Sequence, residues 1–441
     1  MNSLNDFGLN FNNKVKFNFA GGNLSSDCGL LLVKEFIHKL GLDQIIKKFF
    51  RTSGNDSIRT HHDSENLMQN IYQVIAGYHK DDCADHLKLD PVMSTILDKE
   101  VLASQPTLSR FYNRLDYENI KQIESIMEQA RHIVYGIEAP KHVILDIDST
   151  LCGTSGKQEG ACFNFHYQDN GYHPLLCYDG LTGDLLKAEL RKGSAYSCTG
   201  IVEFLEPVLK DFKTNYPNVT LLVRGDSGFA TPELYELCEK YGVLYAIRLK
   251  KNAVLDNILE ERGVMDVFDK FYQQNPEHNT EFYTEIQYKA KSWRRERRVA
   301  VKIEHKSDEL FHFVTYVVTN FTSITSRNII ATYCNRGTME NFIKESKSGF
   351  GFDNVSSHTM EANANRMLIR ALAYNIVNWM KRLVFSAECA KFQIETIRTK
   401  FIKVAGRIVK SGRYITFKLC SSFPYQSFFE QTLGKITCLN I

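Results

Sequence analysis

The sequence predicts a mixed α/β fold in which a mainly helical N-terminal domain precedes a domain built on a β-sheet. Three observations indicate this class. Apolar residues recur at helical intervals between about residues 24 and 135, short apolar strand-like runs begin at residue 142, and strands alternate with helices up to residue 249. Because 441 residues exceed one ordinary hydrophobic core, we expect more than one domain.

The composition narrows the class of protein. With 43% hydrophobic and 24% charged residues the chain is globular. No basic segment followed by an apolar run opens it, and no apolar span is long enough for a membrane helix, so neither secretion nor membrane insertion is expected. Eleven irregularly spaced cysteines favour reduced thiols in the cytoplasm.

The N-terminal domain is expected over residues 1–138. Its helical repeats include Leu67, Ile71 and Val74. Small helical domains commonly bind a DNA groove, which suggests DNA binding by this domain, although no clear helix-turn-helix signature is present. The net charge of +3 does not indicate nucleic-acid binding by itself.

The sheet begins with antiparallel neighbours. Turn signals at Asp169-Asn170-Gly171 and at 179–183 separate the early runs, and short connections join antiparallel strands. These runs are HVILDIDST (142–150), ACFNFHYQ (161–168), HPLLCYDG (173–180) and LLKAELR (185–191).

The later strands are expected to be parallel, because helices alternate with them. A helix over about 198–213 leads into the strand TLLVRGD (220–226), and a second helix, starting at Pro232, leads into VLYAIRL (243–249). This order is that of the ribonuclease H fold. A β-rich insertion is predicted over about 250–325, and residues 386–441 form a basic C-terminal segment.

Four acidic residues lie at positions that such a fold would bring close together. Asp146 and Asp148 are two apart on one strand and therefore share a face. Asp226 ends the strand TLLVRGD, and Glu340 lies on a helix after the insertion. Carboxylates of this kind bind Mg²⁺, and a pair of ions about 4 Å apart can activate water or a 3′-hydroxyl for attack on a phosphodiester.

Around Glu340, the sequence predicts a helix with a phosphate-binding face. Tyr333, Arg336, Glu340 and Lys347 fall within an arc of about 60°, and Lys344 lies beside them. Three residues can cap its start (Ser323, Thr325 and Ser326), and Gly349 can end it. The alternative is a solvated amphipathic helix with ordinary Arg and Glu pairs.

These residues carry a resemblance to a known family. The chain resembles the DDE transposases of bacterial insertion sequences, in the group with a Tyr-x2-Arg-x3-Glu-x6-Lys signature. All four signature positions match, at Tyr333, Arg336, Glu340 and Lys347. The similarity spans about residues 140–385, with Asp148-Ser-Thr and the strand ending in Asp226 as the other two motifs.

The resemblance implies a ribonuclease H-like catalytic domain over residues 139–385. It implies that Asp148, Asp226 and Glu340 are catalytic and bind two Mg²⁺ or Mn²⁺ ions, with Asp146 as a less certain further ligand. The implied contacts to DNA are Tyr333, Arg336, Lys344, Lys347, Trp293, Arg294 and Arg295. Among these, Trp293 is the candidate for stacking on a flipped base.

The implied reaction is cleavage of DNA at the element's ends by water, followed by joining of the 3′-hydroxyl to target DNA. The expected partners are double-stranded DNA, as terminal inverted repeats and as target, and a second copy of the chain when DNA is bound. The expected location is the bacterial cytoplasm, at the nucleoid, with no membrane partner.

Three alternatives stay open. The first is a metal-dependent nuclease of the same fold that does not join strands. The second is a haloacid-dehalogenase-like phosphatase, because Asp146-x-Asp148-x-Thr150 fits its first motif, but Ala230 stands where a later acid is expected. The third is an inactive DNA-binding relative, which the intact acids oppose.

Overall fold

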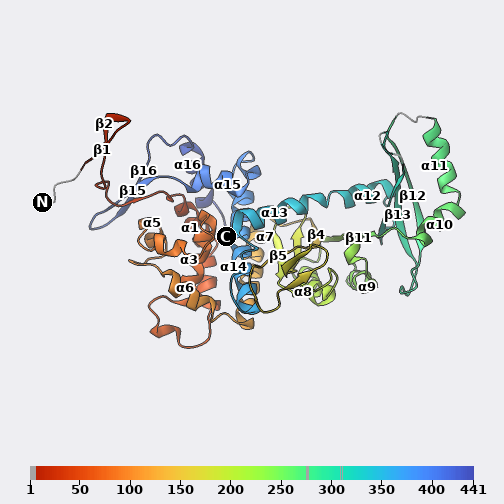
Figure 1. Cartoon of the computed structure of the whole chain (residues 1–441), viewed down its shortest axis with the longest axis horizontal. Helices are drawn as coiled ribbons and strands as arrows, with labels where there is room; N and C mark the ends of the chain where they lie inside the picture. Colours follow the sequence, from red (N-terminus) through yellow and green to blue (C-terminus); the bar gives the residue numbers. More distant parts are fainter. Residues whose placement is uncertain (1–5, 275–277, 308, 310) are drawn as a thin grey trace. The chain divides into compact units, whose positions relative to one another are not determined.

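The computed structural model describes residues 6–274, 278–307, 309 and 311–441 (Figure 1). The chain divides into two units. Unit 1 contains residues 1–137, 348–352 and 368–441, and unit 2 contains residues 138–347 and 353–367. Residues 386–441, predicted as a separate basic segment, therefore lie in the same unit as the N-terminal helices.

Unit 1 is mainly helical. Its helices bury apolar faces such as Leu67 and Ile71 of α3 and Trp379 of α14, which are 0 to 1% exposed. The helices are α1 Leu30–Lys39, α2 Leu42–Phe49, α3 Asp63–Ala76, α4 Cys83–Leu87, α5 Pro91–Ile96, α6 Gln105–Tyr112, α7 Tyr117–Ile137, α14 Met360–Leu383, α15 Ile394–Ile397 and α16 Gln426–Thr437, α14 having its first residues in unit 2. The strands are β1 Phe7–Leu9, β2 Asn12–Phe17, β3 Leu24–Ser25, β15 Gly406–Lys410 and β16 Ile415–Leu419.

Unit 2 is built on an eight-stranded mixed sheet of order β12-β13-β14-β11-β10-β4-β8-β9. The main-sheet strands are β4 His142–Ser149, β8 Leu175–Asp179, β9 Leu185–Glu189, β10 Thr220–Gly225, β11 Leu244–Leu249, β12 Thr280–Tyr288, β13 Arg297–His305 and β14 Phe313–Thr319. The helices are α8 Ile201–Asn215, α9 Pro232–Lys240, α10 Ala253–Glu261, α11 Val264–Gln273, α12 Ser326–Cys334 and α13 Gly337–Phe350, the last three residues of α13 belonging to unit 1.

The strand directions agree with the sequence prediction. β4 is antiparallel to β8, and β8 is antiparallel to β9, whereas β4, β10 and β11 are parallel. Helices α8 and α9 make the two crossovers between the parallel strands. The predicted mixed α/β fold class is therefore confirmed.

The predicted run 161–168 does not join this sheet. Only Cys162–Asn164 (β6) is a strand, and it pairs with β7 Asp169–Tyr172 in a small sheet that also includes β5 Cys152–Gly153. The turn expected at Asp169-Asn170-Gly171 is therefore wrong, because these residues form β7. A Cβ on Gly171 would lie 2.2 Å from the carbonyl oxygen of Cys152, so glycine here permits close approach of two strands.

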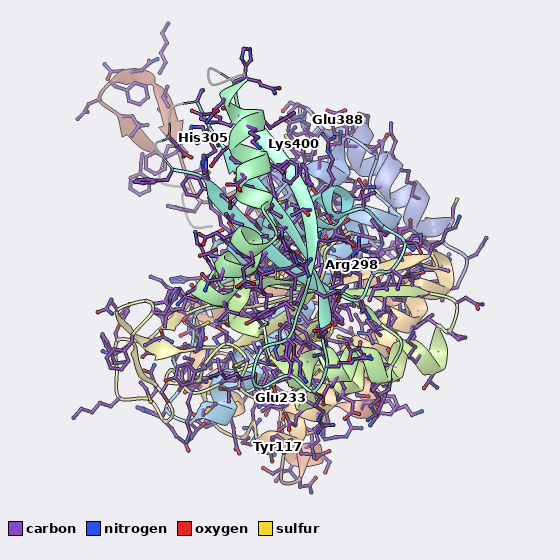
Figure 2. All side chains as sticks on the ribbon, turned by 90° about the vertical axis from the view of Figure 1, so that its right-hand side faces the viewer. Tyr117, Glu233, Arg298, His305, Glu388 and Lys400 are labelled. Atoms are coloured by element: carbon purple, nitrogen blue, oxygen red, sulfur yellow. The ribbon has the colours of Figure 1, made fainter. Side chains whose placement is uncertain are left out.

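The predicted β-rich insertion contains the expected strands, but they extend the central sheet. β14 pairs with β11, and β13 and β12 continue the sheet beyond it. Two helices that the sequence did not predict, α10 and α11, precede these strands and lie beside them in Figure 1. Arg298 of β13, labelled in Figure 2, forms an ion pair with Glu285 of β12.

Candidate active site

Asp148 and Asp226 line one cleft of about 990 Å³ in unit 2. Asp148 is near the end of β4, and Asp226 directly follows the neighbouring parallel strand β10. The carboxyl ends of parallel strands meet at one edge of a sheet, which explains why the two acids come together. Asp226 also caps the 3₁₀ turn Ser227–Phe229, because its Oδ1 accepts a hydrogen bond of 2.8 Å from the amide of Gly228.

The carboxylate of Asp148 is held by two groups. Its Oδ1 accepts the backbone N–H of Ser149 at 2.8 Å, and its Oδ2 lies 2.8 Å from Nη2 of Arg336. Burial raises the pKa of Asp148 above its ordinary value, the Arg336 charge opposes this rise, and the charge of Asp226 adds to it. Two carboxylates that repel each other in a partly buried cleft are a suitable place for a cation.

Asp146 is in a different environment from Asp148. Its side chain is fully buried, and its two oxygens are each 2.6 Å from a nitrogen of Arg224, on the adjacent strand β10. Burial raises the pKa of Asp146, and the Arg224 guanidinium opposes that rise. Arg224 also donates a hydrogen bond of 2.6 Å to the carbonyl of Thr332, so this buried pair joins β4, β10 and α12.

The predicted continuous helix around Glu340 is divided. α12 ends at Cys334, Asn335 is its C-cap, and α13 begins at Gly337. The prediction of one unbroken helix is therefore wrong. The break is explained by the interactions of Arg336, which lies there. Its side chain donates a 3.2 Å hydrogen bond to the carbonyl of Ile147 in β4 and forms an ion pair with the carboxylate of Asp148.

Arg336 and Lys347 nevertheless both reach the end of β4. Nζ of Lys347 donates to the carbonyl of Leu151 at 2.6 Å. Glu340 precedes Lys347 by seven residues, or about two turns of α13, so helical geometry directs both toward the same side. Glu340 is exposed in the first turn of α13, and within the described residues it makes no ion pair or side-chain hydrogen bond.

Tyr333 is partly buried at the end of α12. It packs against a core cluster made by Leu222, Ala246, Ala300, Val317, Ile329 and Ile330. Burial raises the pKa of Tyr333, Arg336 and Arg248 oppose this rise, and Asp226 adds to it. The hydroxyl is therefore within electrostatic range of the acidic cleft. Lys344 is exposed on α13.

The aromatic residue that the sequence singled out is packed inside the protein. Trp293 is 5% exposed and makes edge-to-face contacts with Tyr235 and Tyr288 at centroid distances of 5.3 and 5.2 Å. Its ring is therefore not available for stacking on a base in this structure. Its neighbours Arg294 and Arg295 are 85% and 63% exposed, and they pair with acids of α9.

The cleft also contains groups that the sequence analysis did not name. Tyr167 donates a 3.2 Å hydrogen bond to the carbonyl of Ser149, and burial, Asp148 and Asp226 raise its pKa to about 12. Arg248, Lys250 and Lys251 line the cleft from the end of β11. A signal for the last three was present in the sequence, since Arg248 is near the end of the apolar strand that neighbours the one ending in Asp226, and Lys250 and Lys251 follow that strand.

Comparison with known proteins gives a family. The model of the family described as "Transposase DDE domain group 1" matches residues 7–441. Among solved structures, the chain is similar to the piggyBac transposase in a cryo-EM structure of its synaptic complex with hairpin DNA. The identity is 13% and the TM-score 0.43, over 86% of this chain and 80% of that chain. No curated protein matches the chain. None of the described helices has the length and apolar character needed to cross a membrane.

Proposed function

Because this chain belongs to the DDE transposase family, we propose that it cuts DNA at the ends of a bacterial insertion sequence and joins the freed 3′-hydroxyl to target DNA. The observation that carries this proposal is the meeting of Asp148 and Asp226 in one cleft, with Arg336 between the cleft and the Glu340 helix. We assign the sheet of β9, β8, β4, β10 and β11 as the ribonuclease H-like core.

The chemistry of the donor set suits divalent cations, although among the described residues the carboxylates of Asp148, Asp226 and Glu340 do not all lie within 4.8 Å of one another. Asp148, Asp226 and Glu340 offer carboxylate oxygens, which are the ligands that Mg²⁺ and Mn²⁺ prefer. Two such ions would activate the attacking water or 3′-hydroxyl and stabilise the charge on the leaving oxygen. Asp146 has both oxygens occupied by Arg224, so we propose that it positions β4 and β10 and leaves metal binding to the other three acids.

The cations of the site provide places for DNA phosphates. Arg336 keeps its charge because Asp148 and Asp226 outweigh the effect of burial and raise its pKa. Together with Lys344 and Lys347 it would offset charge on the scissile phosphate and its neighbours. Tyr333 would contribute a hydroxyl at the same edge. Trp293 is left out of this set because it is buried.

The remaining parts of the proposal concern partners. Exposed Arg294 and Arg295 are proposed contacts to the DNA backbone, where phosphate would compete with their present acidic partners. The substrates are double-stranded terminal inverted repeats and target DNA at the bacterial nucleoid. The need to hold two element ends together suggests a dimer of the chain on DNA.

The test is a cleavage and joining assay on labelled DNA with the flanking inverted repeats, in Mg²⁺ or Mn²⁺. Asp226→Asn and Glu340→Gln should abolish both products while DNA binding in EDTA persists. Glu233→Gln, an exposed acid of α9, is the matched control and should react like the parent.

Three other results would change the assignment. Cleavage without any joined product would favour a nuclease of the same fold. DNA binding by the parent without cleavage would indicate an inactive relative. Cleavage that survives both substitutions would refute the role of these acids.

A further inference from the structure

The chain between Glu395 and Glu430 contains no acidic residue. We call the hairpin of β15 and β16 within this segment, residues 406–419, the basic ribbon (Figure 1). Four cations lie on it, all of them exposed, and within the described residues none of the four forms an ion pair or a side-chain hydrogen bond. They are Arg407, Lys410, Arg413 and Lys418.

The three cations that precede the basic ribbon in this segment have structural partners. Nζ of Lys403 lies 2.7 Å from the buried carboxylate of Asp27, and Lys400 lies over two aromatic rings. Arg398 is buried, and its Nε donates a 2.9 Å hydrogen bond to the carbonyl of Ile75. The described residues provide no such partner for the cations of the basic ribbon, so their charges do not stabilise the fold.

Two of the cations on the basic ribbon directly oppose each other. Arg407 of β15 and Lys418 of β16 are cross-strand partners in the antiparallel register that also pairs Val409 with Thr416. Directly opposed side chains lie on the same face of a sheet, and like charges in such a pair lower its stability. An anion that lies against both charges would remove this repulsion.

The shape of the basic ribbon suits a groove in duplex DNA. β3 pairs only with the first two residues of β15, so the rest of the ribbon is two strands wide. Its base is held by unit 1, because the amide of Cys28 donates a 3.1 Å hydrogen bond to the carbonyl of Val404. Its turn is closed by a 2.9 Å hydrogen bond from the amide of Ser411 to the carbonyl of Tyr414. The major groove of B-DNA admits a two-stranded ribbon.

We propose that the basic ribbon enters the major groove of the DNA at the element's end, with Arg407 and Lys418 on backbone phosphates and Arg413 of the turn on base edges. This inference rests on the proposed function and adds the surface that recognises the end. Phosphates supply the negative charge that the ribbon lacks. Arginine bound to guanine is the commonest specific contact in the major groove.

The first test measures phosphate contacts by fluorescence anisotropy, with the full-length chain in EDTA over a range of salt concentrations. Arg407→Gln/Lys418→Gln should bind a labelled duplex of the element's end and a shuffled duplex about tenfold more weakly than the parent. The slope of log Kd against log salt should fall by about 2, one for each lost contact. Lys48→Gln/Lys88→Gln removes two exposed cations of unit 1 outside the ribbon, and this matched control should bind like the parent.

The second test measures base recognition with the same two duplexes. Arg413→Gln should lower the ratio of the affinity for the element's end to that for the shuffled duplex by about tenfold. The urea midpoint of Arg407→Gln/Lys418→Gln should stay unchanged or rise, because the substitutions remove a repulsion. A loss of affinity that occurs only together with a lower midpoint would show that the ribbon is structural, and it would overturn the inference.

The outcomes separate this inference from the proposed function. A double variant with the affinity and salt slope of the parent overturns the role of the ribbon even if cleavage still depends on Asp226. An equal loss of affinity for single-stranded DNA or RNA of the same length overturns the groove assignment. A parent that binds the duplex through the ribbon without cutting it supports this inference and overturns the proposed function. A parent that binds no DNA overturns both.

Discussion

The buried pair of Asp146 and Arg224 allows a quantitative test of its structural role. The two side chains are 0% and 2% exposed and make two hydrogen bonds of 2.6 Å. Asp146→Asn keeps the shape of the side chain but leaves the positive charge of Arg224 without a compensating negative charge in the core. Breaking a buried pair on one side costs about 3 to 5 kcal/mol. Arg224→Met should cost a similar amount, because it leaves the Asp146 carboxylate alone.

The double variant Asp146→Leu/Arg224→Met should be far more stable than the sum of the single variants predicts. Replacing both partners removes the uncompensated charge, and such replacements are often neutral. The remaining loss is the hydrogen bond to the carbonyl of Thr332, worth about 1 kcal/mol. We therefore expect the double variant to lose only about 1 to 2 kcal/mol of the free energy of unfolding.

The assay is urea unfolding followed by tryptophan fluorescence. The chain has two tryptophans, Trp293 in unit 2 and Trp379 in unit 1, so a Trp379→Phe background reports on unit 2 alone. Single substitutions that cost less than about 1 kcal/mol, or a double variant no more stable than either single variant, would refute the reasoning. Loss of Mn²⁺ binding in a folded double variant would show that the metal site depends on this pair.

Three further substitutions test this buried pair and two other places in the structure. Gly180→Ala places a Cβ 2.3 Å from Oδ2 of Asp146 and 2.6 Å from Nη2 of Arg224, so it should lower the urea midpoint of unit 2, and an unchanged midpoint would contradict this geometry. Burial and two nearby arginines lower the pKa of His79 from 6.5 to about 4, so the unfolded state binds more protons between these values. The stability of unit 1 should therefore be full above pH 6.5 and fall toward pH 4, by at most about 3 kcal/mol, and His79→Gln should remove this decline in urea titrations. Lys347→Met should lower DNA affinity for all sequences and reduce the slope of log Kd against log salt by about 1, whereas an unchanged slope would exclude a phosphate contact.

The sequence was a good guide to strands with continuous or alternating apolar residues. The runs 220–226 and 243–249 became β10 and β11 with at most small changes at their ends. Their pairing was less accessible, because register and neighbours depend on residues far away in the chain. The sequence therefore did not show that the strands of the predicted insertion join the central sheet, through pairs such as Ala246 with Thr319.

Two local patterns were overridden by tertiary contacts. Asp169-Asn170-Gly171 has turn chemistry, yet it forms a strand because Gly171 lets the backbone of Cys152 approach closely. The periodicity around residue 335 is helical, yet the helix divides where Arg336 is drawn to β4. Neither outcome follows from local propensity, which tertiary contacts can override.

The candidate site was partly accessible from sequence. The order of the acids placed Asp148 and Asp226 on neighbouring strands, where the structure has them in one cleft. Arg224 carried a signal that the sequence analysis did not use, since a charged residue inside an apolar strand needs a buried partner. Trp293 was misleading because four arginines follow it closely in the sequence, whereas in the structure these arginines pair with acids, as Arg297 does with Glu239.

The central claim is that Asp148, Asp226 and Glu340 bind the same cations. The most direct test is Mn²⁺ binding to the complex of the chain with its element's end, measured by the electron paramagnetic resonance signal of free Mn²⁺. Asp148→Asn, Asp226→Asn and Glu340→Gln should each weaken binding at least about tenfold, while Glu233→Gln binds like the parent. Unchanged Mn²⁺ binding in Glu340→Gln would show that the exposed acid of α13 does not share the site, and it would contradict this account.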